Sequence, residues 1–114
     1  MTAKETDLAL PEGCPLDKLL KFFATEWTAH IIWTLGRTDE LRFGMLRRSL
    51  PGDVSARVLS ARLKQLVAKG LINRNDFGTT PLHVSYSLTA EGKLLDALLV
   101  KIAKLSEEMP LSLS

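Results

Sequence analysis

The sequence is poor in cysteine and in long apolar runs. A single cysteine, Cys14, occurs in 114 residues, so no disulfide can form within the chain. No apolar run approaches the roughly 18 residues that a membrane-spanning helix needs, and the first residues lack the pattern of a secretory signal. We therefore expect a cytoplasmic protein that has no membrane partner.

Residues suited to catalysis and metal binding are also scarce. The two histidines, His30 and His83, are far apart in the sequence, and with one cysteine they do not form a metal-ligand cluster. The chain has neither a glycine-rich phosphate loop nor the Gly-x-Ser-x-Gly turn of many hydrolases. These absences argue against an enzyme, and we expect neither a metal nor another cofactor.

The remaining composition is that of one ordinary globular domain. Hydrophobic residues make up 46% of the chain and charged residues 25%, and 114 residues suffice for one modest core. Pro11 and Gly13 interrupt the polar first residues. We predict a flexible N-terminal tail over residues 1–13, one domain over 14–109 and a short C-terminal tail over 110–114.

Positive charge is concentrated in the middle of the chain. The whole sequence carries a net charge of +2, but residues 41–74 contain eight basic residues and one acid, Asp53, for a net charge of +7. The flanking segments are acidic, with a net charge of −3 before residue 41 and −2 after residue 74. Such segregation is typical of proteins that bind nucleic acid.

The middle segment contains a helix with two different faces. Leu59, Leu63 and Leu66 recur at positions i, i+4 and i+7, so one stripe of this helix is apolar and is expected to face the core. The opposite side is cationic and otherwise small, and it consists of Arg57, Ala61, Lys64 and Ala68. A helix of this kind fits the DNA major groove, about 12 Å wide, because no bulky side chain holds it away from the bases. The alternative is a surface helix whose charges are simply solvated.

The segments on both sides of this helix complete a helix-turn-helix pattern. Residues 43–50 form a short helical pattern that ends at the Pro-Gly turn signal of residues 51–52. Asp53 or Ser55 is then a candidate cap for the second helix, which ends at Gly70. Two helices joined by a tight turn, with basic residues on the exposed side of the second, indicate DNA binding.

Two further helices are predicted before this motif. Pro15 suits the first turn of a helix, and apolar residues then recur at helical spacing. Thr25 is a candidate cap for a second helix, in which Trp27, Ile31 and Leu35 form an apolar stripe that ends at a glycine. The pattern predicts two helices on the N-terminal side of the helix-turn-helix.

A β-hairpin is predicted after the motif. Residues 71–77 and 82–88 have the pattern of two strands, and a very short strand is predicted at 41–43. In the second hairpin strand Val84, Tyr86 and Leu88 alternate with His83, Ser85 and Ser87. The first three are therefore expected to face inward. A hairpin placed directly after a recognition helix forms a wing that lies along phosphates or in the minor groove.

The last helix is predicted to begin at Thr89 and to end before Pro110. Its apolar residues are Leu94, Leu95, Leu98, Leu99, Ile102 and Leu105. This surface is wider than one small core needs, and a patch of several hundred Å² is rarely left exposed on a monomer. We predict a homodimer with an α+β fold, mainly α, of the winged helix-turn-helix type with a two-stranded β wing.

The order and spacing of several short motifs resemble the HxlR-type family of bacterial winged helix-turn-helix transcriptional regulators, which are related to the MarR group. The matching pieces are Cys14-Pro15, Trp27-Thr28, Arg42-Phe43-Gly44 with Leu46-Arg47-Arg48, Leu50-Pro51-Gly52, Ser55 with Leu59 and Arg62-Leu63, Gly70-Leu71-Ile72 with Arg74, and Tyr86-Ser87-Leu88-Thr89 with Gly92. The resemblance implies a homodimer that is paired through N- and C-terminal dimerisation helices. It also implies binding to a palindromic operator in double-stranded DNA.

Within this frame we predict which residues contact DNA. They are Arg47, Arg48, Ser55, Arg57, Ser60, Ala61, Arg62, Lys64, Arg74, Thr79 and His83. Arg57 is expected to contact bases or phosphate, and Lys64 phosphate. Arg62 is a candidate for either a phosphate contact or an intramolecular ion pair, and Ser55 for either a helix cap or a DNA contact.

Two sets of residues are candidates for sensing a signal. Cys14 is expected near a helix N-terminus, where the helix dipole favours the reactive thiolate, and several members of the resembled family sense oxidants or electrophiles through a cysteine at this place. The alternative is a small residue that only starts the helix. Trp27, His30 and Trp33 are spaced three apart and are candidates for lining a small-molecule pocket between the second and last helices, although tryptophans on a helix more often belong to the core.

These observations predict a dimeric DNA-binding transcriptional regulator that responds to a small-molecule or oxidant effector. The alternative is a winged-helix domain that binds another protein without binding DNA. In that case the basic segment would meet an acidic protein surface.

Overall fold

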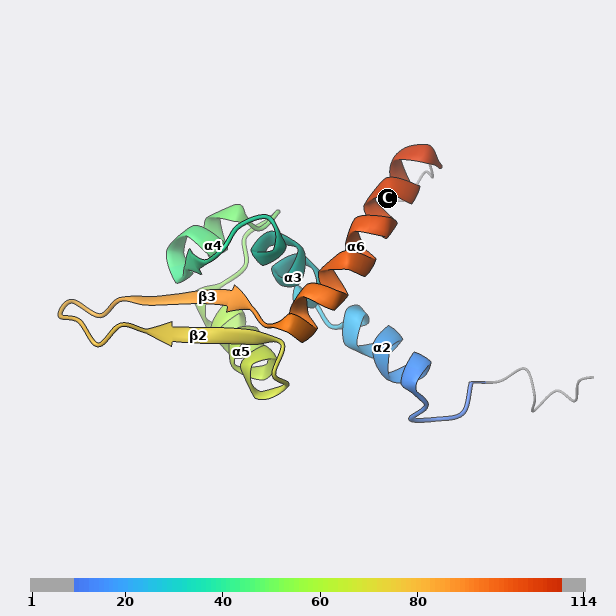
Figure 1. Cartoon of the computed structure of the whole chain (residues 1–114), viewed down its shortest axis with the longest axis horizontal. Helices are drawn as coiled ribbons and strands as arrows, with labels where there is room; N and C mark the ends of the chain where they lie inside the picture. The colour runs from blue at the N-terminus through green and yellow to red at the C-terminus, as the bar shows by residue number, and fades with distance from the viewer. Residues whose placement is uncertain (1–9, 110–114) are drawn as a thin grey trace, which may run out of the picture.

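The structure, a computed structural model, describes residues 10–109, over which the chain forms five helices and one small antiparallel sheet. In chain order the elements are α2 (Pro15–Ala24), α3 (Thr28–Gly36), β1 (Leu41–Arg42), α4 (Phe43–Ser49), α5 (Ala56–Ala68), β2 (Ile72–Asp76), β3 (Val84–Leu88) and α6 (Ala90–Glu108). The β2–β3 hairpin projects from one end of the molecule, and α2 and α6 diverge from each other at the opposite end (Figure 1). This order and arrangement confirm the winged helix-turn-helix fold. Of the predicted tails, residues 1–9 and 110–114 lie outside the described residues, whereas residues 10–13 lead into α2 through a turn.

Helix α3 lies at the centre of the core. Ile31 and Ile32 are fully buried and Leu35 is almost so, because both α6 and the sheet pack against this helix. The predicted stripe of α5 is buried as well, with 0 to 2% exposure for Leu59, Leu63 and Leu66. Each such side chain contributes about 1.5–3 kcal/mol by leaving water. The spacing of apolar residues along α5 therefore predicted its buried face correctly.

The turn between α4 and α5 is held by side-chain contacts and by one glycine. The hydroxyl oxygen of Ser55 accepts a hydrogen bond from the Val58 amide at 3.1 Å, which confirms Ser55 as the cap of α5. Arg47 donates from Nε to the carbonyl oxygen of Val54 at 2.7 Å across the turn. Gly52 has a φ of +121°, and a Cβ there would come within 3.1 Å of the Trp27 ring. The turn therefore requires glycine at this position.

The prediction that Thr25 caps the second helix is wrong. Helix α3 begins at Thr28 with Trp27 at its N-cap, where Trp27 has a φ of 70° and makes no capping hydrogen bond from its side chain. Thr25 instead ends α2, donating its amide to the carbonyl of Phe22. The left-handed conformation of Trp27 accompanies the packing of its indole against the core cluster and Gly52. Packing that is distant in sequence thus overrides the local capping preference.

The sheet has three strands, in the order β1-β3-β2. The hairpin pairs Ile72 with Leu88 and Asp76 with Val84, and the short β1 joins the free edge of β3 by pairing Leu41 with Tyr86. The wing itself is the predicted two-stranded hairpin. The two-residue strand β1 pairs with the other edge of β3, so β3 is the central strand of the sheet.

Ser85 lies on the side of the strand opposite Val84, Tyr86 and Leu88, where the alternating pattern predicted exposure, but it is buried. Ser85 is only 1% exposed, and its hydroxyl donates to the Glu40 carboxylate at 2.8 Å. On the same face, Asn75 lies 3.4 Å from the Ser85 hydroxyl oxygen and 3.3 Å from that of Ser87. The Glu40 carboxylate therefore satisfies this buried hydroxyl on the central strand of the sheet.

Helix α6 begins at a fixed junction with the end of α5. Thr89 caps the helix by accepting from the Gly92 amide at 3.1 Å, and its hydroxyl also donates to the Gly70 carbonyl at 2.7 Å. A Cβ at Gly92 would lie 2.2 Å from the Leu71 carbonyl oxygen, so only glycine permits this close approach. The predicted start of the last helix is confirmed.

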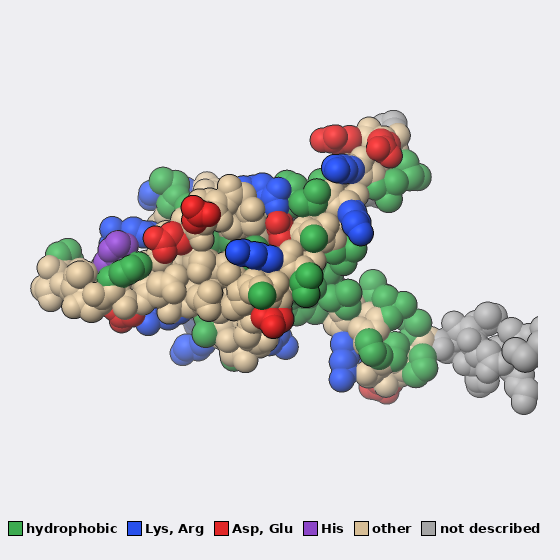
Figure 2. Space-filling view, in the orientation of Figure 1, with side chains coloured by type: hydrophobic (Ala, Val, Ile, Leu, Met, Phe, Trp, Pro, Cys, Tyr) green, Lys and Arg blue, Asp and Glu red, His purple; other side chains and the backbone are tan. Residues whose placement is uncertain are grey.

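Much of the apolar surface of α6 remains exposed in the single chain. Leu94 is 72% exposed and Ile102 51%, and α2 has no buried residue and exposes Leu16 and Leu20 by half. Figure 2 shows hydrophobic side chains gathered over α6 and α2 at the end of the molecule opposite the hairpin. The predicted excess of apolar surface is therefore present and extends to α2.

Candidate nucleic-acid interface and effector pocket

The exposed side of α5 carries the predicted small and cationic residues. Arg57, Ser60, Ala61 and Lys64 are all exposed, while the leucine stripe of the same helix is buried. Neither Arg57 nor Lys64 takes part in any of the ion pairs found among residues 10–109. Their charges are therefore free to meet an anionic partner.

Three of the predicted DNA-contacting residues within or beside the helix-turn-helix motif form hydrogen bonds that hold the motif together. The hydroxyl oxygen of Ser55 caps α5, and Arg47 closes the helix-turn-helix turn through Val54. Arg62 donates from Nε to the Glu26 carbonyl at 2.8 Å and from Nη1 to the Gln65 side chain at 3.3 Å. Its contact is thus an intramolecular hydrogen bond to a backbone carbonyl, and it forms no ion pair with the described residues. Arg48 is exposed on α4.

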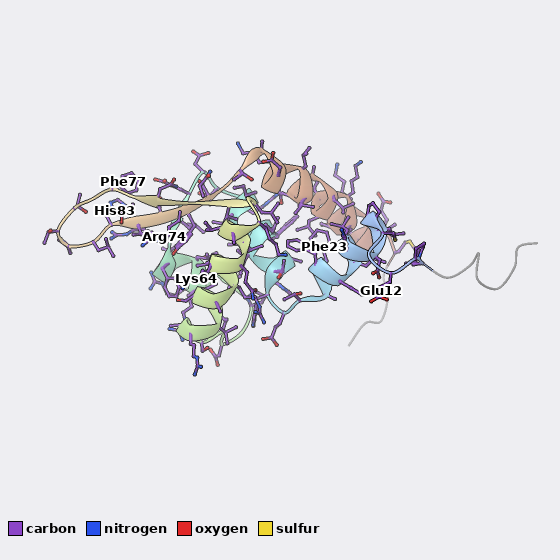
Figure 3. All side chains as sticks on the ribbon, turned by 90° about the horizontal axis from the view of Figure 1, so that it is seen from below. Glu12, Phe23, Lys64, Arg74, Phe77 and His83 are labelled. Atoms are coloured by element: carbon purple, nitrogen blue, oxygen red, sulfur yellow. The ribbon has the colours of Figure 1, made fainter. Side chains whose placement is uncertain are left out.

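The other predicted residues lie on the wing. Arg74 is close to Asp76 on the same strand, with 3.8 Å between Nη1 and the carboxylate, and the rings of His83 and Phe77 stack with centroids 4.4 Å apart. Thr79 donates from its hydroxyl to the Pro81 carbonyl at 2.9 Å and shapes the tip. Figure 3 shows Arg74, Phe77 and His83 along the hairpin, and Lys64 on the neighbouring helix α5. The structure thus brings the wing residues and the cationic side of α5 to one end of the molecule.

Sequence reasoning missed Arg42 as a member of this surface. Arg42 is exposed on β1 and donates from Nη2 to the Leu82 carbonyl of the wing at 3.4 Å. It belongs to the basic middle segment, but its position beside the wing depends on the pairing of β1 with β3. A strand of two residues gives no periodic signal that would predict such pairing.

A cavity of about 900 Å³ lies between α3, α4 and α6. Two of the three predicted pocket residues, His30 and Trp33, line it, and the prediction placed it correctly between the second and last helices. Trp27 does not line this cavity. It packs edge to face on His30, with ring centroids 5.4 Å apart, and lines a smaller neighbouring cavity of about 360 Å³. Arg37 and Met45 are lining residues that the sequence reasoning missed.

Cys14 occupies the N-cap of α2, as its place before Pro15 predicted. Its sulfur accepts a hydrogen bond from the Asp17 amide at 3.3 Å, and the residue is half-buried. The Gly13 amide donates to the Asp17 carboxylate at 3.2 Å, and the Lys21 Nζ atom lies 3.1 Å from the same carboxylate. These two contacts lower the pKa of Asp17 below its ordinary value. The first turn of α2 is therefore an organised cap with a free thiol.

Two classes of site are not found in the described part of the chain. Over residues 10–109 no group of three metal-ligating side chains comes together. None of the helices described there has the length and apolarity needed to cross a bilayer.

Comparison with known proteins assigns the chain to a family. Residues 22–111 match the family model described as HxlR-like helix-turn-helix. The chain is 36% identical over 97 residues to YdzF of Bacillus subtilis (strain 168), described as an uncharacterised HTH-type transcriptional regulator, and the match covers 85% of this chain and 88% of YdzF.

Solved structures agree with this assignment. A protein from Porphyromonas gingivalis W83 that is placed in the MarR family of transcriptional regulators has a TM-score of 0.77 and 36% identity, with 88% of this chain and 96% of that one covered. The redox regulator HypR in its oxidised form has a TM-score of 0.74 and 26% identity, with coverage of 84% and 97%. The fold, the family model and these relatives together show that the chain belongs to the HxlR family of helix-turn-helix transcriptional regulators.

Proposed function

We propose that this regulator binds a palindromic operator as a homodimer, with α5 of each copy in the DNA major groove. The observation that carries the proposal is the exposed side of α5, where Arg57 and Lys64 form no ion pair with the described residues. Such free cations keep their charge for phosphates and base edges. Ser60 and Ala61 between them are small and exposed, which permits close approach to the groove floor.

We assign three roles to the basic residues of the motif and the wing. Arg57 lies in the first turns of α5 and serves base recognition, while Lys64, Arg48 and Arg74 serve phosphate contacts. Thr79 and His83 follow the DNA backbone beside the wing. Arg47 and Arg62 mainly hold the motif together, because each donates to a backbone carbonyl of the chain.

Dimerisation uses the apolar end of the molecule. Leu94, Leu98 and Leu105 on α6 are exposed by 72, 37 and 52%, and α2 adds Leu16 and Leu20. Burying such side chains against a second copy removes them from water at about 25 cal/mol per Å². A two-fold axis at this end also sets two copies of α5 about one DNA turn, 34–36 Å, apart.

Cys14 serves as an oxidant sensor in this proposal. The Cys14 sulfur lies at the N-cap of α2, and HypR, to which the chain is similar, is described as a redox regulator. Two Cys14 thiols of a dimer form one disulfide by giving two electrons and two protons to an oxidant such as diamide, which becomes the hydrazine. The test is operator binding by the wild type and Cys14→Ser with and without diamide. Release of the wild type alone supports sensing, and equal behaviour of both proteins contradicts it.

Fluorescence anisotropy with a mixed-sequence DNA duplex tests DNA binding itself. Because phosphate contacts release counterions, we expect affinity that falls steeply between low and moderate salt. A protein-interaction module would show no binding even at low salt. Lys64→Ala should reduce the salt slope by about one contact, whereas Lys101→Ala on α6 should leave it unchanged.

A further inference from the structure

The loop between α2 and α3, residues 25–27, touches the helix-turn-helix motif at two places. From α5, Arg62 donates through Nε to the Glu26 carbonyl at 2.8 Å. The next residue of the loop, Trp27, covers the turn between α4 and α5, because a Cβ on Gly52 would come within 3.1 Å of its ring. Two consecutive residues of this loop therefore contact both α5 and the turn that precedes it.

Trp27 has a backbone conformation that is rare for a bulky residue. Among residues 10–109 it is the one non-glycine residue with a positive φ, of 70°. A left-handed tryptophan is strained and persists where the packing around it fixes the conformation. Here the indole lies against Gly52 and packs edge to face on His30, with ring centroids 5.4 Å apart. Tertiary contacts therefore set the direction in which the chain passes from α2 to α3.

Arg62 differs from the other cations on α5. Arg57 and Lys64 are exposed and belong to none of the ion pairs found over residues 10–109. Arg62 is half-buried, and besides its bond to Glu26 it donates from Nη1 to the Gln65 side chain at 3.3 Å. A hydrogen bond from a charged donor is stronger than one between neutral groups. The Arg62 guanidinium is therefore fixed on the side of α5 that meets the loop.

Helix α2 is weakly held by the rest of the chain. It has no buried residue, and a cavity of about 360 Å³ lies where it joins α3. This cavity is lined by residues 23–27, by Ala29 and His30 of α3 and by Pro51 of the turn. In the proposed dimer the second copy packs on α2 and so sets the orientation of this helix. A change in that orientation moves the loop, and the loop contacts α5 directly.

We propose that the loop over residues 25–27 positions α5 relative to α2, with Arg62 and Trp27 as the two positioning residues. Through this link the packing of the dimer fixes the angle at which α5 meets DNA. Arg62 then has no phosphate contact, and its loss impairs the fit to the operator while the general attraction to DNA remains. The proposal deepens the proposed function, on which it rests, by naming what sets the orientation of α5.

The distance between spin labels on α2 and α5 tests this link without DNA. The labels are placed at Lys18→Cys and Ser60→Cys, both exposed positions, in a full-length Cys14→Ser chain. Dilution with unlabelled protein leaves the distance within one chain, which pulsed electron paramagnetic resonance measures. We expect Arg62→Met to broaden this distance distribution, and the matched control Lys64→Met to leave it unchanged. An unchanged distribution in Arg62→Met overturns the proposal.

A second variant tests the other contact of the loop. Trp27→Phe has a smaller ring that loses the contact with Gly52, so it should broaden the same distribution, and a distribution like that of the wild type contradicts the role of Trp27. These measurements contain no DNA. Absence of DNA binding by the wild type would therefore refute the proposed function, whereas unchanged label distances would refute the link alone.

Fluorescence anisotropy with a selected operator and a mixed-sequence duplex tests the consequence for DNA binding. We expect Arg62→Met to bind the operator about tenfold more weakly, the loss that one hydrogen bond from a charged donor accounts for. Its salt slope on the mixed duplex should equal that of the wild type, whereas Lys64→Met should lose about one contact. Urea denaturation checks that each variant is folded under the assay conditions. A reduced salt slope in Arg62→Met, or an unchanged operator affinity, contradicts the proposal.

Discussion

Helices α5 and α6 are both amphipathic, but they present opposite chemistry to solvent. Helix α5 buries Leu59 and Leu63 in the core, and α6 packs the partly buried Leu95 and Leu99 against the same core. On the exposed side α5 has free cations and small residues, whereas α6 has leucines such as Leu94. A charged surface suits an anionic partner such as DNA, whereas an apolar surface suits burial against another apolar surface. In the proposed function, DNA recognition and dimerisation therefore use opposite ends of the molecule.

The largest expected loss of operator binding comes from making the exposed side of α6 polar, like that of α5. Leu94→Glu with Leu98→Glu places charges on the apolar surface that we assign to the dimer interface, so we expect a monomer at micromolar concentration. Loss of the second half-site should weaken operator binding by about 100-fold or more. Sedimentation velocity and anisotropy measure the two effects.

The control for this experiment is Lys101→Glu, which changes the charge of α6 at a position that is already exposed and polar. It should remain dimeric. A Leu94→Glu/Leu98→Glu protein that is still a dimer would refute the assignment of this face to assembly.

A smaller loss of operator binding is expected from single substitutions on α5 and on the wing. Arg57→Ala should weaken specific binding by about 1–3 kcal/mol and relax the preference for one base pair in each half-site. Arg74→Ala on the wing should weaken all sequences alike, because phosphate contacts carry no sequence information. Competition assays against a panel of single-base operator variants distinguish the two outcomes. The same loss on every sequence for both variants would show that base reading lies elsewhere.

A third prediction separates stability from recognition on α5 itself. Arg62→Ala removes the hydrogen bond to the Glu26 carbonyl, which is 2.8 Å long and lies at the surface, so we expect a loss of about 1 kcal/mol in the free energy of unfolding. Arg57→Ala is the matched control, because Arg57 has no partner among the described residues and should leave that free energy unchanged. Urea denaturation measures both variants. Equal stability of the two proteins would mean that the Arg62 contact contributes nothing.

What local sequence determines was predictable in this chain. The cap at Ser55, the cap at Thr89 and the stripe of Leu59 and its neighbours depend on residues three to seven positions apart, and the structure confirms them. The exposure of the basic residues Arg57 and Lys64 was predictable for the same reason. Their charges are close together in the sequence, on a helix whose exposed side the periodicity had defined.

The features that were missed depend on contacts between distant residues. Arg37 forms an ion pair with Asp96, which is 59 positions away, and Arg62 donates to the Glu26 carbonyl, which is 36 positions away. The hydroxyl of Ser85 donates to Glu40, 45 positions away, and the N-cap of α3 is Trp27, whose ring lies against Gly52. Periodicity and capping preferences contain no information about such pairs.

The smallest expected effect concerns the first turn of α2, at the apolar end. The pKa of Asp17 is lowered by the Gly13 amide and by Lys21, so its ionised form stabilises this turn above the ordinary carboxyl pKa, about 3.9. The contribution should be lost as the pH falls through the lowered pKa of the folded state. Circular dichroism from pH 5 downward should show a slight loss of helix in the wild type. In Asp17→Asn this step should be absent, and its persistence would assign it to another carboxylate.

The central claim is that pairing through α6 and α2 sets the separation of the two α5 helices in a dimer. Hydroxyl-radical footprinting on an operator selected from random DNA tests this claim most directly. If the dimer pairs through α6 and α2, each α5 enters its own major groove. The account predicts two protected segments on one face of the duplex, their centres about 10–10.5 base pairs or a multiple of that apart. A single protected segment, or two segments on opposite faces, would contradict it.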